Sequence, residues 1–276
     1  MMTMLLALAL LWPLVVIGWT LWSAYRAPAA YQSYFSALWL SAAWPALLLA
    51  YGGEAQWTMD AWMLGGEWAL NSLSRPWLAF TALLWGVAAI HARGYFAAEQ
   101  AKAQKGDQDT QRRLLRLALL WPLTLLGNVL LIIAQDIASF YLGFALMTFA
   151  AYALVVHSGT VEARLGAKAY LMLAVVGEGL IIGGFLWAAG EADTLTLQGL
   201  REGILVAEQG AWMAALLCLG FGVKAGVIGL HVWLPLAHPV APAPASAVLS
   251  GAMIKAGLLG WISVLPLGDE QVSVSL

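Results

Sequence analysis

Long hydrophobic runs separated by short polar segments dominate the pattern along this chain. Most runs hold about 20 residues, the length that an α-helix needs to cross the hydrocarbon core of a bilayer. The pattern therefore predicts an all-α, polytopic membrane protein with about eight transmembrane helices. The expected spans are residues 4–22, 33–51, 76–91, 117–135, 137–156, 169–189, 211–230 and 246–265.

The overall composition agrees with a membrane location. Hydrophobic residues make up 62% of the 276 residues and charged residues 10%, whereas soluble domains average about 25% charged residues. The net charge of −2 argues against a nucleic-acid partner. Residues 4–22 resemble a signal peptide only in hydrophobicity. They lack a basic start and contain Pro13, so we expect a retained helix.

The basic residues are concentrated in alternate polar segments, which predicts the orientation. With the N-terminus outside, residues 23–32, 92–116 and 157–168 become cytoplasmic. We therefore expect a bacterial-type inner (cell) membrane protein with its N-terminus and C-terminus outside. These segments carry Arg26, Arg93, Lys102, Lys105, Arg112, Arg113, Arg116, Arg164 and Lys168, whereas the outer segments carry Arg75 and Arg201.

The chain is expected to form a single membrane domain over residues 1–276. Residues 1–96 would contain three peripheral helices, residues 97–113 a polar cytoplasmic loop, and residues 114–265 a core of helices four to eight. Asp136 stands between two spans, where an aspartate is typical of a helix N-cap.

Three charged residues lie inside predicted spans of this charge-poor sequence. Glu178 lies about 14 Å into span six, Lys224 about 9 Å from the inner end of span seven, and Lys255 about 14 Å into span eight. A charge at such depth is costly, and it usually faces the bundle interior or a water-filled cavity. We therefore predict that the three residues form a buried path for ions.

A proline-rich segment at 231–244 breaks the chain after Lys224, and it predicts that helix seven is interrupted. Non-helical backbone at membrane depth is tolerated only where protein or a cavity surrounds it. His231 and His238 lie in this break. Histidine titrates near neutral pH, so either residue can relay protons from the cytoplasm or can have a purely structural role.

The sequence contains no recognisable catalytic or cofactor motif. Cys218 is the single cysteine and lies in an apolar run, which excludes a disulfide framework within the chain. His231 and His238 have no nearby carboxylate or cysteine, so we expect no metal site. We also expect no cofactor and no catalytic centre. At most, the chain is the membrane subunit of a proton-pumping oxidoreductase.

The segment HVWLPLAHPVAPAPASAVLSGAMIKAG (231–257) resembles the signature of the proton-conducting antiporter-like membrane subunits. This family occurs in respiratory complex I, in Mrp-type multisubunit sodium/proton antiporters and in group 4 membrane-bound hydrogenases. LNSLSRPWLAF…RGYF (70–96) is a weaker match. The resemblance implies that Lys224 and Lys255 are proton-carrying lysines, and that His231 and His238 lie near the cytoplasmic connection.

Two departures from the family pattern limit this implication. In the run FYLGFALMTFAAY (140–152), Ala145 stands where the family has a glutamate that pairs with the lysine at Lys224. We hypothesise that Glu178 substitutes for it from helix six. Family members also have about fourteen helices in two inverted halves. The resemblance therefore covers the N-terminal half only, and a second chain, a scaffold role or a truncated sequence would each account for this.

These observations leave three hypotheses open. The first is a proton-translocating subunit of a multisubunit respiratory, hydrogenase or cation/proton antiporter complex, in which other membrane subunits and lipid are the partners. The second is a non-transporting structural or assembly subunit of such a complex. The third is a membrane partner in an inorganic-carbon uptake system. The sequence does not distinguish protons from sodium ions.

Overall fold

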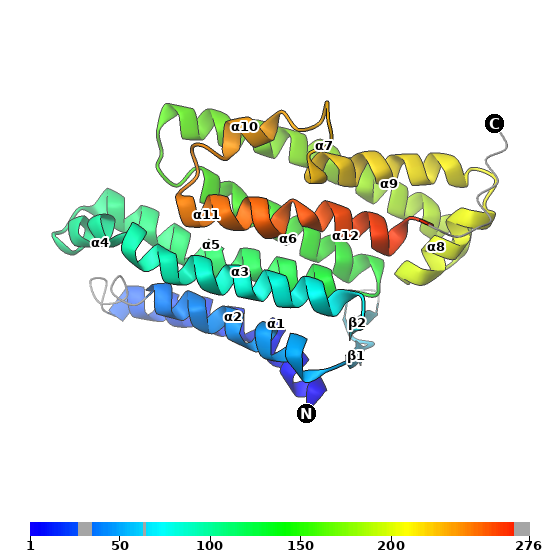
Figure 1. The fold of residues 1–276 in the computed structure, drawn as a ribbon, viewed down its shortest axis with the longest axis horizontal. Coiled ribbons are helices and arrows are strands. Elements are labelled where there is room, and N and C mark those ends of the chain that lie inside the picture. Colours follow the sequence, from blue (N-terminus) through cyan, green and yellow to red (C-terminus); the bar gives the residue numbers. More distant parts are fainter. Residues whose placement is uncertain (27–34, 63–64, 268–276) are drawn as a thin grey trace.

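The computed structural model describes residues 1–26, 35–62 and 65–267 of the chain. Long helices run side by side, roughly along one direction (Figure 1). In chain order the elements are α1 (Met2–Arg26), α2 (Phe35–Gly52), β1 (Ala55–Met59), β2 (Gly66–Leu70), α3 (Ser74–Tyr95), α4 (Ala97–Gln104), α5 (Gln108–Ile133), α6 (Ile137–Val155), α7 (Val161–Ala192), α8 (Leu197–Val206), α9 (Gly210–Ala225), α10 (Trp233–Ala237), α11 (Ala243–Val248), the π-helical segment η2 (Leu249–Met253) and α12 (Lys255–Val264).

Five helices of the described part are long and apolar enough to cross a membrane. They are α1, α5, α6, α7 and the combined segment Ala243–Val264, while the apolar helices Ala37–Gly52 and Gly210–Ala225 are shorter. The mainly helical fold is confirmed, and the number of crossings stays a prediction. Residues 33–34 of the second expected span, most of the loop 23–32 and the C-terminal end lie outside the described residues.

Residues 97–113 differ from the polar loop that the sequence predicted. They form α4, a short turn and the first residues of α5. Their Ala, Gln, Lys and Glu side chains are good helix formers despite their polarity. The Asp107 side chain also accepts hydrogen bonds from the backbone N–H groups of Asp109 and Thr110, and so caps the start of α5.

A short antiparallel hairpin joins α2 to α3, and it departs from the all-α expectation. Strand β1 pairs with β2, with Trp57 opposite Trp68. The hairpin lies at the same end of the molecule as α8 (Figure 1). Each strand has five residues, so its alternation is too short to stand out between two hydrophobic runs.

Aromatic stacking fastens the N-terminal helices to the core. Trp39 of α2 stacks on Trp121 of α5, with ring centroids 4.4 Å apart and planes at 7°. Trp85 of α3 meets the same Trp121 ring edge-on at 4.8 Å. All three side chains are almost completely buried. These contacts make α5 the common support of α2 and α3.

Helices α5 and α6 cross at very close range because glycine occupies both sides of the contact. A Cβ atom at Gly127 would meet the backbone of Met147, and one at Gly143 would lie 2.6 Å from the Leu131 nitrogen. Asp136 caps α6 by accepting a hydrogen bond from the Ser139 N–H at 2.7 Å, as predicted. Its other oxygen accepts one from the Glu67 N–H and so ties β2 to this turn.

The chain leaves helical geometry twice near Lys224. Helix α9 ends at Gly226, which has a left-handed φ of 70°. The short helix α10 and a second turn follow, before the chain re-enters as α11, η2 and α12. Trp233 of α10 donates a hydrogen bond from its indole N–H to the Val223 carbonyl, at 2.9 Å. The freed end of α9 is thereby satisfied inside the protein, as a membrane environment requires.

Candidate functional site

Helices α7 and α9 approach closely at the level of the predicted buried charges. A Cβ atom at Gly177 would lie 3.0 Å from the Val223 Cβ, and one at Gly220 would lie 2.8 Å from the Gly177 carbonyl oxygen. Small residues at such a crossing let two membrane helices pack backbone against backbone. The crossing brings Glu178, next to Gly177, toward Lys224, one turn after Gly220.

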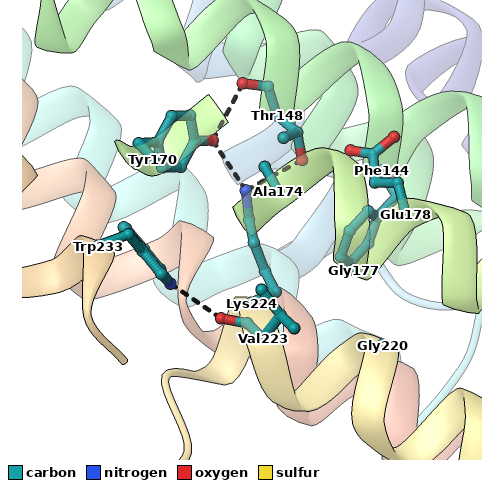
Figure 2. A pocket seen from close by; sticks show the side chains of 10 residues that line it. All are labelled: Phe144, Thr148, Tyr170, Ala174, Gly177, Glu178, Gly220, Val223, Lys224 and Trp233. Atoms are coloured by element: carbon teal, nitrogen blue, oxygen red, sulfur yellow. Dashed lines mark hydrogen bonds between the residues drawn. The ribbon is translucent and has the colours of Figure 1, made fainter. Parts of the chain in front are cut away.

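The Lys224 ammonium is held by α6 and α7. Its Nζ donates hydrogen bonds to the Thr148 hydroxyl and to the Tyr170 hydroxyl, both at 3.0 Å. The Tyr170 and Phe144 rings lie 5.2 and 5.7 Å from the same nitrogen. Figure 2 shows the extended lysine side chain ending beside Tyr170 and Thr148. The residue is only 4% exposed, so the protein itself replaces water around this cation.

Glu178 shares the cavity of Lys224 but does not contact the ammonium directly. The side chain is 3% exposed, and neither carboxylate oxygen has a hydrogen-bond partner in this structure. No salt bridge within 4.0 Å joins it to Lys224, although the two groups interact electrostatically. In Figure 2 the carboxylate lies on the Thr148 side of the lysine nitrogen, and Tyr170 lies on the other side.

The cavity between these two groups has room for about one water molecule. Its volume is about 10 Å³, and Ala174 and Gly220 complete the lining near the charged groups. Lys224 and Glu178 are among its lining residues, while the part of its wall open to a small molecule is apolar.

His238 lies on the far side of Trp233 from the Lys224 cavity. The Trp233 ring is 5.2 Å from the Tyr170 ring and 6.1 Å from the His238 ring. His238 is half-buried, and its Nδ1 lies 3.1 Å from the Ser246 hydroxyl. Its Nε2 is buried and has no partner in this structure. The structure therefore places one of the two predicted histidines next to the site, separated from it by an indole.

His231 and Lys255 stand apart from this cavity. His231 is exposed, and its Nδ1 accepts a hydrogen bond from the Gly229 N–H at 3.2 Å, which stabilises the turn after α9. The Lys255 ammonium lies 3.9 Å from the centroid of the Phe80 ring on α3. Lys255 is half-buried and does not line the cavity. Lys224 and Glu178 are thus the predicted residues that share one cavity.

Thr148, Tyr170 and Trp233 belong to the site, but the sequence reasoning did not single them out. Thr148 lies about one turn after Ala145, on the same helix α6. The sequence did contain one signal for Thr148, because it is a polar residue in an apolar run, one turn from the position where Ala145 replaces the family glutamate. Tyr170 and Trp233 look like ordinary membrane aromatics in the sequence, because only the fold brings them to Lys224.

A second cluster of polar side chains, also not predicted, lies where α4 meets the end of α6. The buried His157 side chain is 3.1 Å from a Glu99 carboxylate oxygen. This hydrogen bond, together with the charges of His157, Arg113 and Lys102, lowers the pKa of Glu99 below its usual value of 4.5, against the opposing effect of burial.

Among the described residues, no cluster of three or more His, Cys, Asp or Glu side chains could hold a metal ion.

Comparison with known proteins assigns this arrangement to a family. The family described as NADH:quinone oxidoreductase/Mrp antiporter, transmembrane, matches residues 134–275, slightly more than half of the chain. The chain belongs to this family. The match covers α6 to α12 and therefore contains both Lys224 and Glu178. The resemblance to the antiporter-like membrane subunits is thereby confirmed, and the chain is a multi-pass membrane protein.

Two similar curated proteins are named as parts of a hydrogenase and of a formate hydrogenlyase. The chain is 33% identical over 136 residues to hydrogenase-4 component B of Escherichia coli (strain K12). This alignment covers 49% of this chain and 20% of that protein. The chain is 32% identical over 141 residues to formate hydrogenlyase subunit 3 of the same strain, which covers 50% and 22%. The matched segments thus span about a fifth of the length of these relatives.

Two solved structures share the fold over nearly the whole chain. A chain of the membrane-bound sulfane sulfur reductase, an archaeal respiratory membrane complex, gives a TM-score of 0.73 at 20% identity, with 92% of this chain and 51% of that chain covered. A chain of the Mrp complex from Dietzia sp. DQ12-45-1b gives 0.70 at 19% identity, with 95% and 48% covered. This likeness extends the shared fold beyond residues 134–275, and this chain spans about half of each of those two.

Proposed function

We propose that the chain is a proton-translocating, antiporter-like membrane subunit of a multisubunit complex. The observation that carries the proposal is the water-sized intramembrane cavity between Lys224 and Glu178. A buried cation and a buried carboxylate at membrane depth are costly, and such residues are candidates for a functional site. The family membership and the shared fold support it, since similar chains carry names of hydrogenase, quinone oxidoreductase and Mrp complexes.

In this proposal Lys224 and Glu178 carry the proton through the centre of the fold. Protons enter at the cytoplasmic side, where His231 and His238 lie, and reach Lys224 past Trp233. Glu178 takes the role of the family glutamate that Ala145 replaces. Lys255 receives the proton next, after a movement that brings it off Phe80. If Lys224 approached Glu178 to about 4 Å, the two charges would interact by about 4 kcal/mol at an effective dielectric of 20, so the proton occupancy of one group would affect that of the other.

The same proposal includes the surroundings of the chain. It places the protein in a bacterial-type inner membrane, with both termini outside and with other membrane subunits as partners. Redox chemistry, where present, would belong to the partners.

A specific observation supports a second candidate, a non-transporting structural subunit. Ala145 removes the family carboxylate, and its half-buried side chain does not line the cavity of Lys224. In this structural alternative, Lys224 and Glu178 have no role in transport and only stabilise the packing of the helices. The alternative predicts that replacing Lys224 leaves transport unchanged.

The substitution Lys224→Ala separates the two candidates. We expect it to lower proton transport by the complex in inverted membrane vesicles at least tenfold, because the buried proton carrier is gone. Lys168→Ala is the matched control, since Lys168 is an exposed lysine on α7, and it should transport normally. Mass spectrometry of the complex purified in mild detergent must show the same subunits for both variants. Normal transport by an intact Lys224→Ala complex would refute the transport function.

A further inference from the structure

Lys224 rests in a binding position that contains no carboxylate. The hydroxyl groups of Thr148 on α6 and Tyr170 on α7 accept its hydrogen bonds, while the Glu178 carboxylate, which lines the same cavity, forms no salt bridge with it. The ammonium therefore has two places available within one cavity. We call the arrangement of the Thr148 and Tyr170 hydroxyls the neutral seat.

The hydrogen-bond directions fit a donating Lys224 nitrogen, and the aromatic rings beside it favour the charged form. Tyr170 donates its own hydroxyl proton to the Thr148 carbonyl at 3.0 Å, so its oxygen can only accept from Lys224. An ammonium offers three donors and no acceptor, which fits this arrangement. The Tyr170 and Phe144 rings nearby also favour a cation.

We propose that Tyr170 and Thr148 are positioning residues that hold charged Lys224 away from Glu178 and so allow the two groups to exchange partners. This inference rests on the proposed function. When Glu178 is neutral, the lysine stays in the neutral seat. When Glu178 ionises, attraction draws the ammonium across the cavity. Without the neutral seat, the lysine would remain with the carboxylate or lose its proton.

The groups around Lys224 define what such a test can report. The titratable residues that face the cavity are Tyr170 and Glu178, both on α7. Helix α6 contributes Thr148 and Phe144, and its Tyr141 lies near enough to Glu178 to interact with its charge. Helix α10 contributes Trp233, with His238 behind it. Helix α12 packs on α9, but its Lys255 ammonium lies on Phe80.

The test is the pH profile of proton transport by the intact complex in vesicles. Tyr170→Phe keeps the ring and removes one acceptor of the ammonium, so Lys224 should lose its proton at lower pH. We expect the alkaline limb of the profile to move by about one pH unit toward acid, a tenfold change in proton affinity. Tyr152→Phe removes the hydroxyl of a half-buried tyrosine outside the cavity, and it should leave the profile unchanged.

Paired substitutions at Thr148 keep the test decisive if the tyrosine variant does not assemble. Thr148→Val removes the hydroxyl and should also move the alkaline limb of the pH profile toward acid. Thr148→Ser retains a hydroxyl, and its pH profile should match that of the unmodified complex. Unshifted limbs for both Tyr170→Phe and Thr148→Val, with Lys224→Ala inactive, would overturn the neutral seat alone. An active Lys224→Ala complex would overturn both the seat and the transport function.

Discussion

Lys224 makes no salt bridge within 4.0 Å to Glu178, and several weaker contacts offset part of the cost of burying its charge. Hydrogen bonds from a charged donor contribute about 1.5–3 kcal/mol each, and Lys224 makes two of them. Aromatic rings beside a desolvated cation add further stabilisation. Because no single partner dominates, the ammonium can leave this position more easily than it could leave a tight salt bridge. The residue is therefore suited to moving charge.

Glu99 offers a separate residue-scale prediction, outside the membrane-spanning helices. Its pKa is lowered chiefly by the hydrogen bond to His157, so ionised Glu99 stabilises the fold at pH values above its unfolded pKa, near 4.5. This stabilisation disappears as the pH falls through the lower, folded pKa. We expect Glu99→Gln to reduce stability by about 1 kcal/mol at pH 7, with the difference from the unmodified protein shrinking as the pH falls below 4.5 and vanishing below the folded pKa.

Thermal unfolding in detergent at a series of pH values would measure this effect. Glu162→Gln is the control, because Glu162 is exposed at the start of α7 and forms no salt bridge in the described part of the chain. A deficit for Glu99→Gln that stays constant from pH 7 to below the folded pKa would show that the carboxylate charge is not responsible.

At the scale of elements, the crossing of α7 and α9 sets the geometry of the cavity. Gly177→Val would place methyl groups against Val223 and the Gly220 carbonyl, at a position where even a Cβ atom has only 3.0–3.1 Å. We expect the helices to separate, with a loss of about 1–3 kcal/mol in stability and a strong loss of transport. Thermal unfolding and vesicle transport would measure the two effects.

Gly179→Val is the matched control for this substitution. It lies two residues further along the same helix, and a Cβ atom there would meet nothing within 4 Å. Both variants carry the same cost of a β-branched residue in a helix. Equal behaviour of the two would mean that the close crossing is unimportant for the site.

The helices were largely predictable because a hydrophobic run of transmembrane length leaves a chain few alternatives in lipid. The exceptions have physical reasons. Residues 97–113 were interpreted as a loop from their polarity, yet their intrinsic helix propensity decides the structure. The β1–β2 hairpin was missed because two five-residue strands carry too little periodicity.

The site was predictable in depth but not in direction around the helices. Counting residues from the span ends placed Glu178, Lys224 and Lys255 at similar depth, and the structure has the first two lining one cavity. The same count could not predict which side of its helix Lys255 occupies, and its ammonium lies on the Phe80 ring instead of in the cavity. The π-helical segment η2 precedes Lys255 and changes the helical phase of every residue that follows. Tyr170 and Thr148 depend on the packing of three helices, which no local pattern encodes.

On the scale of the whole molecule, the basic residues described in α4, in the start of α5 and in the start of α7 lie at one end of the helices (Figure 1). The β1–β2 hairpin and α8 lie at the other end. This separation agrees with the orientation proposed from the positive-inside rule. Between the two ends, the cavity of Lys224 and Glu178 is the point through which a transported proton would pass.

The most direct test of the account is proton transport by the intact complex carrying Glu178→Gln. Glutamine has nearly the same size but cannot take up or release a proton, so we expect coupled transport to fall at least tenfold while subunit composition is unchanged. Glu162→Gln should transport normally. A fully active Glu178→Gln complex would contradict the claim that Glu178 replaces the carboxylate missing at Ala145, and with it the proposed relay through this cavity.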